Sequence, residues 1–181
     1  MQFTTRCSRH RGFTALELII VLVIGFSIIA VSASKMGELF LSSKITRATS
    51  SILELASSIR SLRGPEGYGA DGPIIAQLKD NGLIPKTLRA DANNQIKNEW
   101  DGTVTVEVDQ AGSEVILTYP AIPKKACAKL ATAILESGVF NSLSIDGGDP
   151  LTQSSNTRNM LTACSAGNAQ NLEFTLTMGN S

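Results

Sequence analysis

The chain has 181 residues, enough for one apolar helix and one modest domain, and it carries 16 basic and 16 acidic residues. This balance gives no excess of positive charge that would favour binding to nucleic acid. The only histidine, His10, lies near the start, so the rest of the chain lacks the commonest general base and metal ligand. No Gly-x-Ser-x-Gly motif or Cys-x-x-Cys pair occurs. We therefore expect no enzyme, no cofactor and no metal site.

The first twelve residues contain Arg6, Arg9 and Arg11 and no acidic residue. A basic segment in front of an apolar one tends to stay in the cytoplasm while the following chain crosses the membrane. Removal of residues 1–12 would leave 13 basic and 16 acidic residues, because three arginines would be lost. The remaining chain would then be slightly acidic.

An uncharged, strongly apolar segment extends from Leu18 to Ser34. About seventeen such residues are near the lower limit for a helix that spans a bilayer, and residues 13–35 together are long enough. Glu17 stands at the head of this segment, where a charge in a membrane helix costs about 2.5–3.5 kcal/mol unless it has a partner. No Lys or Arg lies between Phe13 and Ser34 to supply one. Cleavage of the chain directly before Phe13 would create a cationic amine four residues before Glu17.

The residues around this point run Arg11-Gly12-Phe13-Thr14-Ala15-Leu16-Glu17. This motif resembles the processing site of type IV pilins and related pseudopilins. The resemblance implies that residues 1–12 are a leader, that a prepilin peptidase cuts between Gly12 and Phe13, and that Phe13 is then N-methylated. It also implies that Glu17 of one subunit meets the Phe13 amine of another during assembly. Residues 13–35 would form a transmembrane and filament-core helix, and residues 36–181 a globular head.

Two other interpretations of the apolar segment stay open. A single-pass membrane anchor needs only the apolar residues. A secretory signal peptide needs a basic start, an apolar region and a small-residue cleavage site, which Val31-Ser32-Ala33 would fit. Either case would give a membrane-anchored or secreted binding domain that does not polymerise.

Helix-like spacing of apolar residues continues beyond the apolar segment and predicts one helix over residues 13–63, about 51 residues or roughly 77 Å long. Pro65 ends the pattern. The first half is apolar all round, and the second half has one apolar stripe that suits a domain core. We expect a turn-rich loop over residues 64–73, a short helix over residues 74–81 and a polar loop over residues 90–97.

The clearest strand pattern lies in residues 103–108, and residues 114–119 return after a turn that contains Gly112. Further along the chain, the pattern predicts a helix at residues 124–136, a short strand at 143–145, a solvated loop at 151–170 and a last strand at 172–178. Antiparallel strands with one polar face would pack on the C-terminal half of the long helix. The expected fold class is therefore α+β.

The segment from Asn98 to Val106 is similar to the opening hairpin of PilS-type pilins, a type IVb branch. The overall resemblance thus implies a type IV pilin fold. Trp100 lies beside this turn, and we expect it to belong to the core, with a ligand platform as the alternative. Asp146 and Asp149 flank two glycines, but two acids fall short of the six or more oxygen ligands that calcium takes, which favours a plain turn.

Cys7 lies in the leader, whereas Cys127 and Cys164 lie in the part expected to be exported. Two cysteines in an oxidising compartment usually pair, so we expect a disulfide between Cys127 and Cys164. Two free buried thiols are the alternative. A cysteine pair that brackets the C-terminal region also agrees with the type IVb resemblance.

The resemblance implies the structural subunit, the major one, of a type IV pilus that serves adhesion, aggregation or conjugative mating contact. Its partners would be copies of itself, the prepilin peptidase and the pilus assembly machinery, with no nucleic acid. It would lie in the inner membrane as a precursor and then in an extracellular pilus. A minor pilin or a pseudopilin of type II secretion is the alternative within the family.

Overall fold

The structure, a computed structural model, describes residues 14–90, 95–109, 111–166 and 171–179. The chain divides into two compact units, Met1–Phe40 and Leu41–Ser181. We call the first the amino-terminal unit and the second the head. Gly12 and Phe13, the residues of the expected cleavage site, lie outside the described residues.

Helix α1 (Ala15–Ser61) accounts for the described part of the amino-terminal unit and continues into the head. The backbone N–H of Leu62 still bonds to the carbonyl of Ile59 at 3.0 Å, which tightens the last turn before Pro65. The helix thus ends close to the position that the proline predicts. Within the head, α1 buries one stripe of side chains at helical spacing: Ile45, Ala48, Ile52, Leu55, Ala56 and Ile59.

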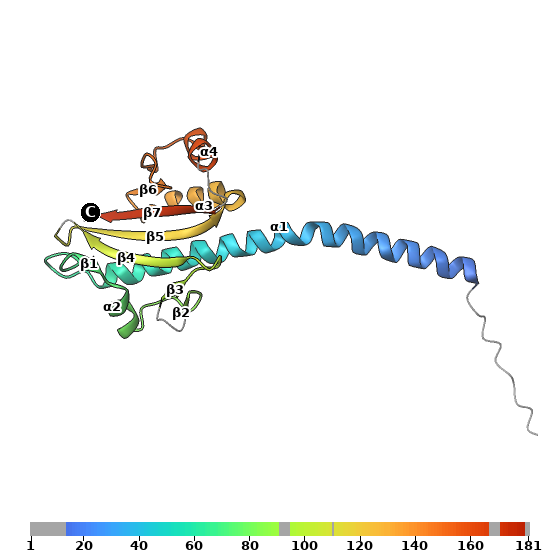
Figure 1. Cartoon of the computed structure of the whole chain (residues 1–181), viewed down its shortest axis with the longest axis horizontal. Helices are drawn as coiled ribbons and strands as arrows, with labels where there is room; N and C mark the ends of the chain where they lie inside the picture. Colours follow the sequence, from blue (N-terminus) through green and yellow to red (C-terminus); the bar gives the residue numbers. More distant parts are fainter. Residues whose placement is uncertain (1–13, 91–94, 110, 167–170, 180–181) are drawn as a thin grey trace, which may run out of the picture. The chain divides into compact units, whose positions relative to one another are not determined.

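Among the described residues, seven antiparallel strands form the sheet of the head, and five of them lie in the order β3-β4-β5-β7-β6. β2 extends this order beyond β3, and β1 pairs separately with β4 (Figure 1). The strands are β1 (Gly72–Pro73), β2 (Arg89–Ala90), β3 (Ile96–Lys97), β4 (Thr103–Asp109), β5 (Glu114–Pro123), β6 (Ser142–Ile145) and β7 (Asn171–Gly179).

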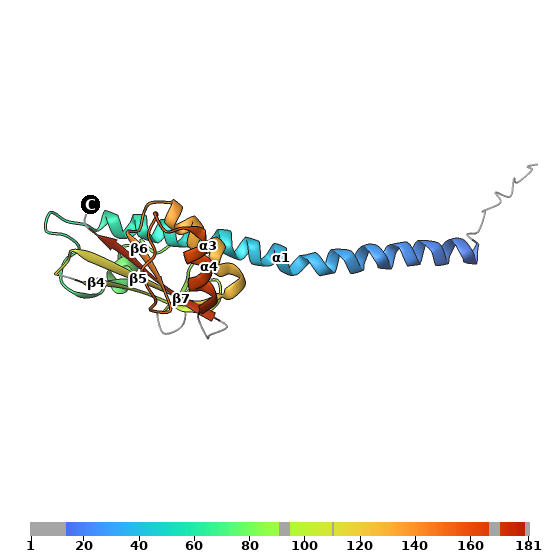
Figure 2. The same ribbon diagram turned by 90° about the horizontal axis from the view of Figure 1, so that it is seen from above.

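The sheet buries one face and leaves the other partly exposed. Cross-strand neighbours such as Val106 and Leu117, or Tyr119 and Phe174, are buried together. The intervening positions carry polar residues such as Thr118 and are partly exposed. Figures 1 and 2 both show the part of α1 that belongs to the head running beside these strands. The expected α+β arrangement, a helix packed on an antiparallel sheet, is therefore confirmed.

Three shorter helices complete the head: α2 (Ile75–Asp80), α3 (Lys124–Glu136) and α4 (Thr157–Ala166). α3 follows β5 directly and contacts β5, β6 and β7. Its bounds are those that the sequence predicts, because Pro123 precedes it and Gly138, with φ of 67°, follows it. α4 packs on α3.

Three predicted loops contain regular structure. The expected loop at residues 64–73 ends in β1, which pairs with β4. The expected loop at residues 90–97 contains the end of β2 and all of β3, where Ile96 is buried and pairs with Val104. Strands of two residues are too short to show a periodic pattern. The expected loop at residues 151–170 contains α4, although it is rich in Ser, Thr and Asn. Met160 and Cys164, four residues apart, are buried on one face of α4, so tertiary packing outweighs weak helix propensity.

The strand β5 is longer than the expected residues 114–119 and continues through Pro120 to Pro123. Its pairing with β7 shifts register between Tyr119 and Ile122. Proline is tolerated at such a bulge because no ladder hydrogen bond from its nitrogen is needed there. Pro120 therefore lies within the strand, and only Pro123 marks its end.

Within the described ranges, no helix meets the length and apolarity needed to cross a membrane. Residue 13 and the side chains of residues 31–35 lie outside these ranges, and the span expected over residues 13–35 stays a prediction.

Candidate assembly site and the disulfide-linked head

Glu17 takes part in a reciprocal cap at the start of α1. Its Oε2 accepts hydrogen bonds from the backbone N–H of Thr14 at 3.2 Å and from the Thr14 hydroxyl at 3.3 Å. The backbone N–H of Glu17 in turn donates to Thr14 Oγ1 at 3.3 Å. This is a capping box, in which the N-cap side chain and the side chain three residues later satisfy each other's free backbone donors.

The capping box gives Glu17 a local role in addition to the expected pairing with a cationic partner. The signal is present in the sequence, since Thr14-x-x-Glu17 followed by an apolar segment is the pattern of such a cap. The cap uses Oε2 alone: among the described residues, Oε1 of Glu17 accepts no hydrogen bond. The carboxylate therefore keeps one oxygen for a further donor.

The amino-terminal unit exposes many large apolar side chains among its described residues. Of the large apolar side chains that are strongly exposed among the described residues, all but Leu161 lie between Leu16 and Phe40. Leu16 is 68% exposed and Phe40 is 64% exposed. The hydroxyl of Ser27 donates to backbone carbonyls of its own helix, 2.7 Å from the oxygen of Val23, and so adds no free donor to this surface. An apolar surface of this extent requires a partner that removes it from water.

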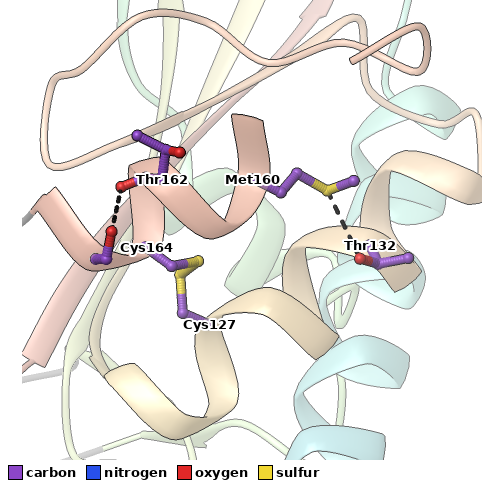
Figure 3. Close-up of a disulfide and its surroundings, with 6 residues drawn as sticks. Cys127, Thr132, Met160, Thr162 and Cys164 are labelled. Carbon is purple, nitrogen blue, oxygen red and sulfur yellow. Dashed lines mark hydrogen bonds between the residues drawn. A yellow bond between two sulfur atoms is a disulfide. The ribbon is translucent and has the colours of Figure 1, made fainter. Parts of the chain in front are cut away.

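Cys127 and Cys164 form a disulfide that joins α3 to α4 (Figure 3). Their Cα atoms lie 5.9 Å apart, and 37 positions separate them in the sequence. Cys127 is fully buried and Cys164 nearly so. The hydroxyl of Thr132 on α3 lies 3.6 Å from Sδ of Met160 on α4, a second contact between the helices (Figure 3). The disulfide thus fixes α4, the helix that the sequence did not predict, on the core.

The turn after β6 contains Asp146, considered above as a calcium ligand with Asp149. Asp146 and Gly147 both have positive φ, 50° and 70°. The N–H of Gly148 bonds to the carbonyl of Ile145 at 2.9 Å, which closes a tight turn. Within the described part of the chain, no group of three or more His, Cys, Asp and Glu side chains is placed to hold a metal ion.

Asn98 organises the turn that leads into β4. Its side-chain oxygen accepts from the N–H groups of Trp100 and Gly102, each at 2.9 Å, and its amide donates to the carbonyl of Pro120 at 2.6 Å. The turn therefore packs directly on β5, and a Cβ at Gly102 would lie 2.6 Å from the same carbonyl oxygen. Trp100 is partly buried and packs against the core, as expected. The segment that resembles PilS-type pilins thus contains a turn that the hydrogen bonds of one buried asparagine stabilise.

Glu99, in the same turn, links three parts of the head. Its Oε1 lies 2.9 Å from the hydroxyl of Ser51 on α1, which in turn lies 2.7 Å from the Thr87 hydroxyl. The phenol of Tyr119 on β5 donates to Glu99 Oε2. Ser51 and Tyr119 are fully buried. No periodic pattern in the sequence indicates this network, because its members come from four separate segments.

We expect Tyr119 to make the stability of the head pH-dependent. Burial raises the pKa of its phenol well above the usual value of 10.0, and the hydrogen bond to Glu99 and the charge of Glu99 raise it further. Above pH 10 the folded head therefore keeps a proton that the unfolded chain loses. The free energy of unfolding contributed by this group is complete below pH 10 and falls as pH rises, by up to about 1.4 kcal/mol per pH unit.

The measurement is urea unfolding of the wild type and of Tyr119→Phe between about pH 9 and pH 11. A plot of the free energy of unfolding against pH should fall less steeply above pH 10 for Tyr119→Phe than for the wild type, because the variant has no phenol to titrate. Tyr68→Phe, which removes the other tyrosine of the chain, serves as the control and should keep the wild-type slope. Equal slopes in wild type and Tyr119→Phe would contradict the expectation.

Comparison with known proteins agrees with this architecture. The family model described as PilS N terminal matches residues 42–177. The crystal structure of a type IVb pilin from Salmonella typhi is 21% identical, with a TM-score of 0.57, over 77% of this chain and 99% of that chain. TcpA, a type IV pilin from Vibrio cholerae El Tor biotype, is 16% identical, with a TM-score of 0.51 and the same coverage of 77% and 99%. No curated protein sequence matches. Because the family model covers most of the chain, including the Asn98 turn and both cysteines of the disulfide, the chain belongs to the PilS family of type IV pilins.

Proposed function

We propose that the chain is the major structural subunit of a type IV pilus that serves adhesion, aggregation or conjugative mating contact. Cleavage by a prepilin peptidase between Gly12 and Phe13 and methylation of the new Phe13 amine precede assembly. The subunit lies in the inner membrane as a precursor and then in the extracellular fibre, where the pilus assembly machinery delivers it. The observation that supports this most strongly is the exposed apolar surface between Leu16 and Phe40.

The exposed apolar side chains of this surface favour any state that removes them from water. Removing apolar area from water stabilises a protein by about 25 cal/mol for each Å². In the amino-terminal unit nothing within the described chain covers the aliphatic side chains of α1. A bilayer can cover them before assembly, and helices of other copies can cover them afterwards. A self-associating apolar helix attached to a folded, polar head is the arrangement that a fibre subunit needs.

Glu17 supplies the register for this association. Its Oε2 is held by Thr14, and its Oε1 stays open to a donor from outside the described residues. The Phe13 amine of a neighbouring subunit would fit that donor by charge. An acid buried among apolar helices without its partner costs about 3–5 kcal/mol, so a wrongly placed helix is rejected.

Two substitutions distinguish the proposed charge pairing of Glu17 from its role in the capping box. Glu17→Gln keeps the capping box, which accepts glutamine at this position, but removes the charge; Thr14→Ala removes the cap and keeps the charge. We expect Glu17→Gln to lower the mass of sheared surface fibres by about tenfold or more, while Thr14→Ala, a cap loss of about 1 kcal/mol, still assembles. Quantitative electron microscopy and immunoblotting of the sheared fraction measure this. Abundant fibres from Glu17→Gln would rule out the pairing role.

Electron microscopy of the wild-type sheared fraction tests the proposal as a whole. A major pilin gives long fibres built from this chain. A minor pilin gives fibres in which the chain is a trace component, and a type II secretion pseudopilin gives only short assemblies. A membrane-anchored or secreted binding domain gives no fibre. Only the first result supports the major-subunit proposal.

A further inference from the structure

The head contains a charged pocket of about 630 Å³. None of its lining residues belongs to the exposed apolar surface between Leu16 and Phe40. Its cations come from two segments, the first turns of α1 within the head and the segment that leads into β2. The turn that Asn98 organises contributes Glu99 and Asp101 to its lining. We call it the basic pocket; its lining is Lys44, Arg47, Lys86, Thr87, Arg89, Glu99 and Asp101.

The charges of the basic pocket do not cancel. Four cations face two carboxylates, so the lining carries a net charge of +2. Both carboxylates are already engaged: Asp101 forms an ion pair with Arg89, and Glu99 accepts hydrogen bonds from Ser51 and Tyr119. The hydroxyl donors leave the charge of Glu99 unchanged, so three cations outside the Arg89–Asp101 pair face one carboxylate, and the net charge of +2 remains.

Those remaining cations are Lys44, Arg47 and Lys86. Lys44 is held in place, because its Nζ donates to the backbone carbonyl of Glu99 at 2.8 Å. Among the described residues, the side chains of Arg47 and Lys86 make no hydrogen bond and no ion pair, and both are exposed. Three positive groups thus surround one pocket with donors free to bind an anion.

We propose that the basic pocket binds a sulfated or phosphorylated saccharide. The guanidinium of Arg47 offers a planar fork that matches two oxygens of a sulfate or phosphate ester, and the lysines add point charges. The pocket has the size of a ligand site and is far larger than one such ion, which calls for a ligand that extends beyond the ester. Every lining side chain is polar or charged, with aliphatic parts only in the Lys and Arg stems, and this favours a largely polar extension such as a sugar.

This inference concerns the head alone. It requires neither cleavage at Gly12 nor pairing through Glu17, so a chain that fails to polymerise could still bind the saccharide. Failure of one proposal is therefore distinguishable from failure of the other.

The test is isothermal titration calorimetry on the full-length chain in a non-ionic detergent. The probes are a heparin-derived sulfated disaccharide, its chemically desulfated form, glucose 6-phosphate and inorganic sulfate. We expect the sulfated disaccharide or glucose 6-phosphate to bind about tenfold or more tightly than inorganic sulfate, and the desulfated form not to bind. Equal affinity for inorganic sulfate, or equal binding of the desulfated form, would overturn the proposal.

A matched pair of variants locates the site. Arg47→Gln with Lys86→Gln removes two exposed charges from the basic pocket. Lys125→Gln with Lys129→Gln removes two exposed charges from α3, outside the pocket. We expect the first pair to weaken binding about tenfold or more and the second to leave it nearly unchanged.

Circular dichroism and thermal unfolding should be unchanged in both, since all four side chains are exposed. Equal weakening in both would indicate unspecific attraction and overturn the proposal. Fibre loss in the pocket variant with full saccharide binding would identify the basic pocket as a contact between copies, which also overturns it.

Discussion

Loss of the Cys127–Cys164 disulfide is expected to lower the free energy of unfolding of the head by about 3–4 kcal/mol. The bond closes a loop over 37 positions, and in the chain-entropy model the stabilisation grows with the logarithm of that length. The loop contains part of α3, β6 and most of α4. Without the disulfide, the unfolded chain therefore has a higher conformational entropy over all three segments. At this chain size, the loss corresponds to roughly 10 °C in the midpoint of thermal unfolding.

The measurement compares the wild type with the double variant Cys127→Ala, Cys164→Ala by urea unfolding of the full-length chain. The two single variants should each lose about as much as the double variant, because either one removes the bond. The variant Cys7→Ala removes the remaining cysteine, in the expected leader, and should change nothing. A loss below about 1 kcal/mol in the double variant would contradict the expected role of the disulfide.

Truncation of Leu55 in α1 is expected to destabilise the head by about 2–5 kcal/mol. Leu55 is fully buried in the stripe that α1 turns towards the sheet. Replacement by alanine removes apolar area from the core and leaves a cavity that the two packed layers can only partly close. Alanine is a good helix former, so the loss reports packing and not helix propensity.

Leu161 provides the matched control for Leu55. It lies on α4 and is 53% exposed, so Leu161→Ala should change the free energy of unfolding by no more than about 0.5 kcal/mol. Both variants are compared with the wild type by urea unfolding. Similar losses in the two variants would show that the stripe of α1 is not the core contact described here.

The elements that the sequence predicts well carry their own local signals. α3 begins after Pro123 and ends before Gly138, and both residues act through the backbone alone. β4 alternates valines with polar residues over seven positions, a pattern that only a half-buried strand needs. The end of α1 follows from Pro65 in the same way.

The elements that the sequence does not predict depend on distant partners. β3 is two residues long and exists because Ile96 pairs with Val104. α4 has weak helix propensity and is held by the disulfide and by the buried side chain of Met160. One local signal was present: Asn156 caps the start of α4, with its side-chain oxygen 2.9 Å from the N–H of Asn159.

The candidate sites divide in the same way. The apolar surface of α1 can be predicted from consecutive residues, and so can the unusual position of the Glu17 carboxylate at the head of the apolar segment. The capping box on Glu17 could also have been read, from Thr14. The basic pocket could not, because Arg47 and Lys86 are far apart in the sequence and only the folded head brings them to one cavity. The link from Glu99 to Ser51 likewise needs the fold.

The proposed fibre requires a subunit that is cleaved between Gly12 and Phe13 before its apolar helix is buried among other copies. Intact-mass spectrometry of the subunit from sheared surface fibres tests this directly. The result that the account predicts is a chain that begins at Phe13 and carries one added methyl group, with Gly12→Ala retaining the leader and yielding no fibres. A native subunit that begins at Met1, as an anchor would, or at Ser34, as a secreted domain would, contradicts it.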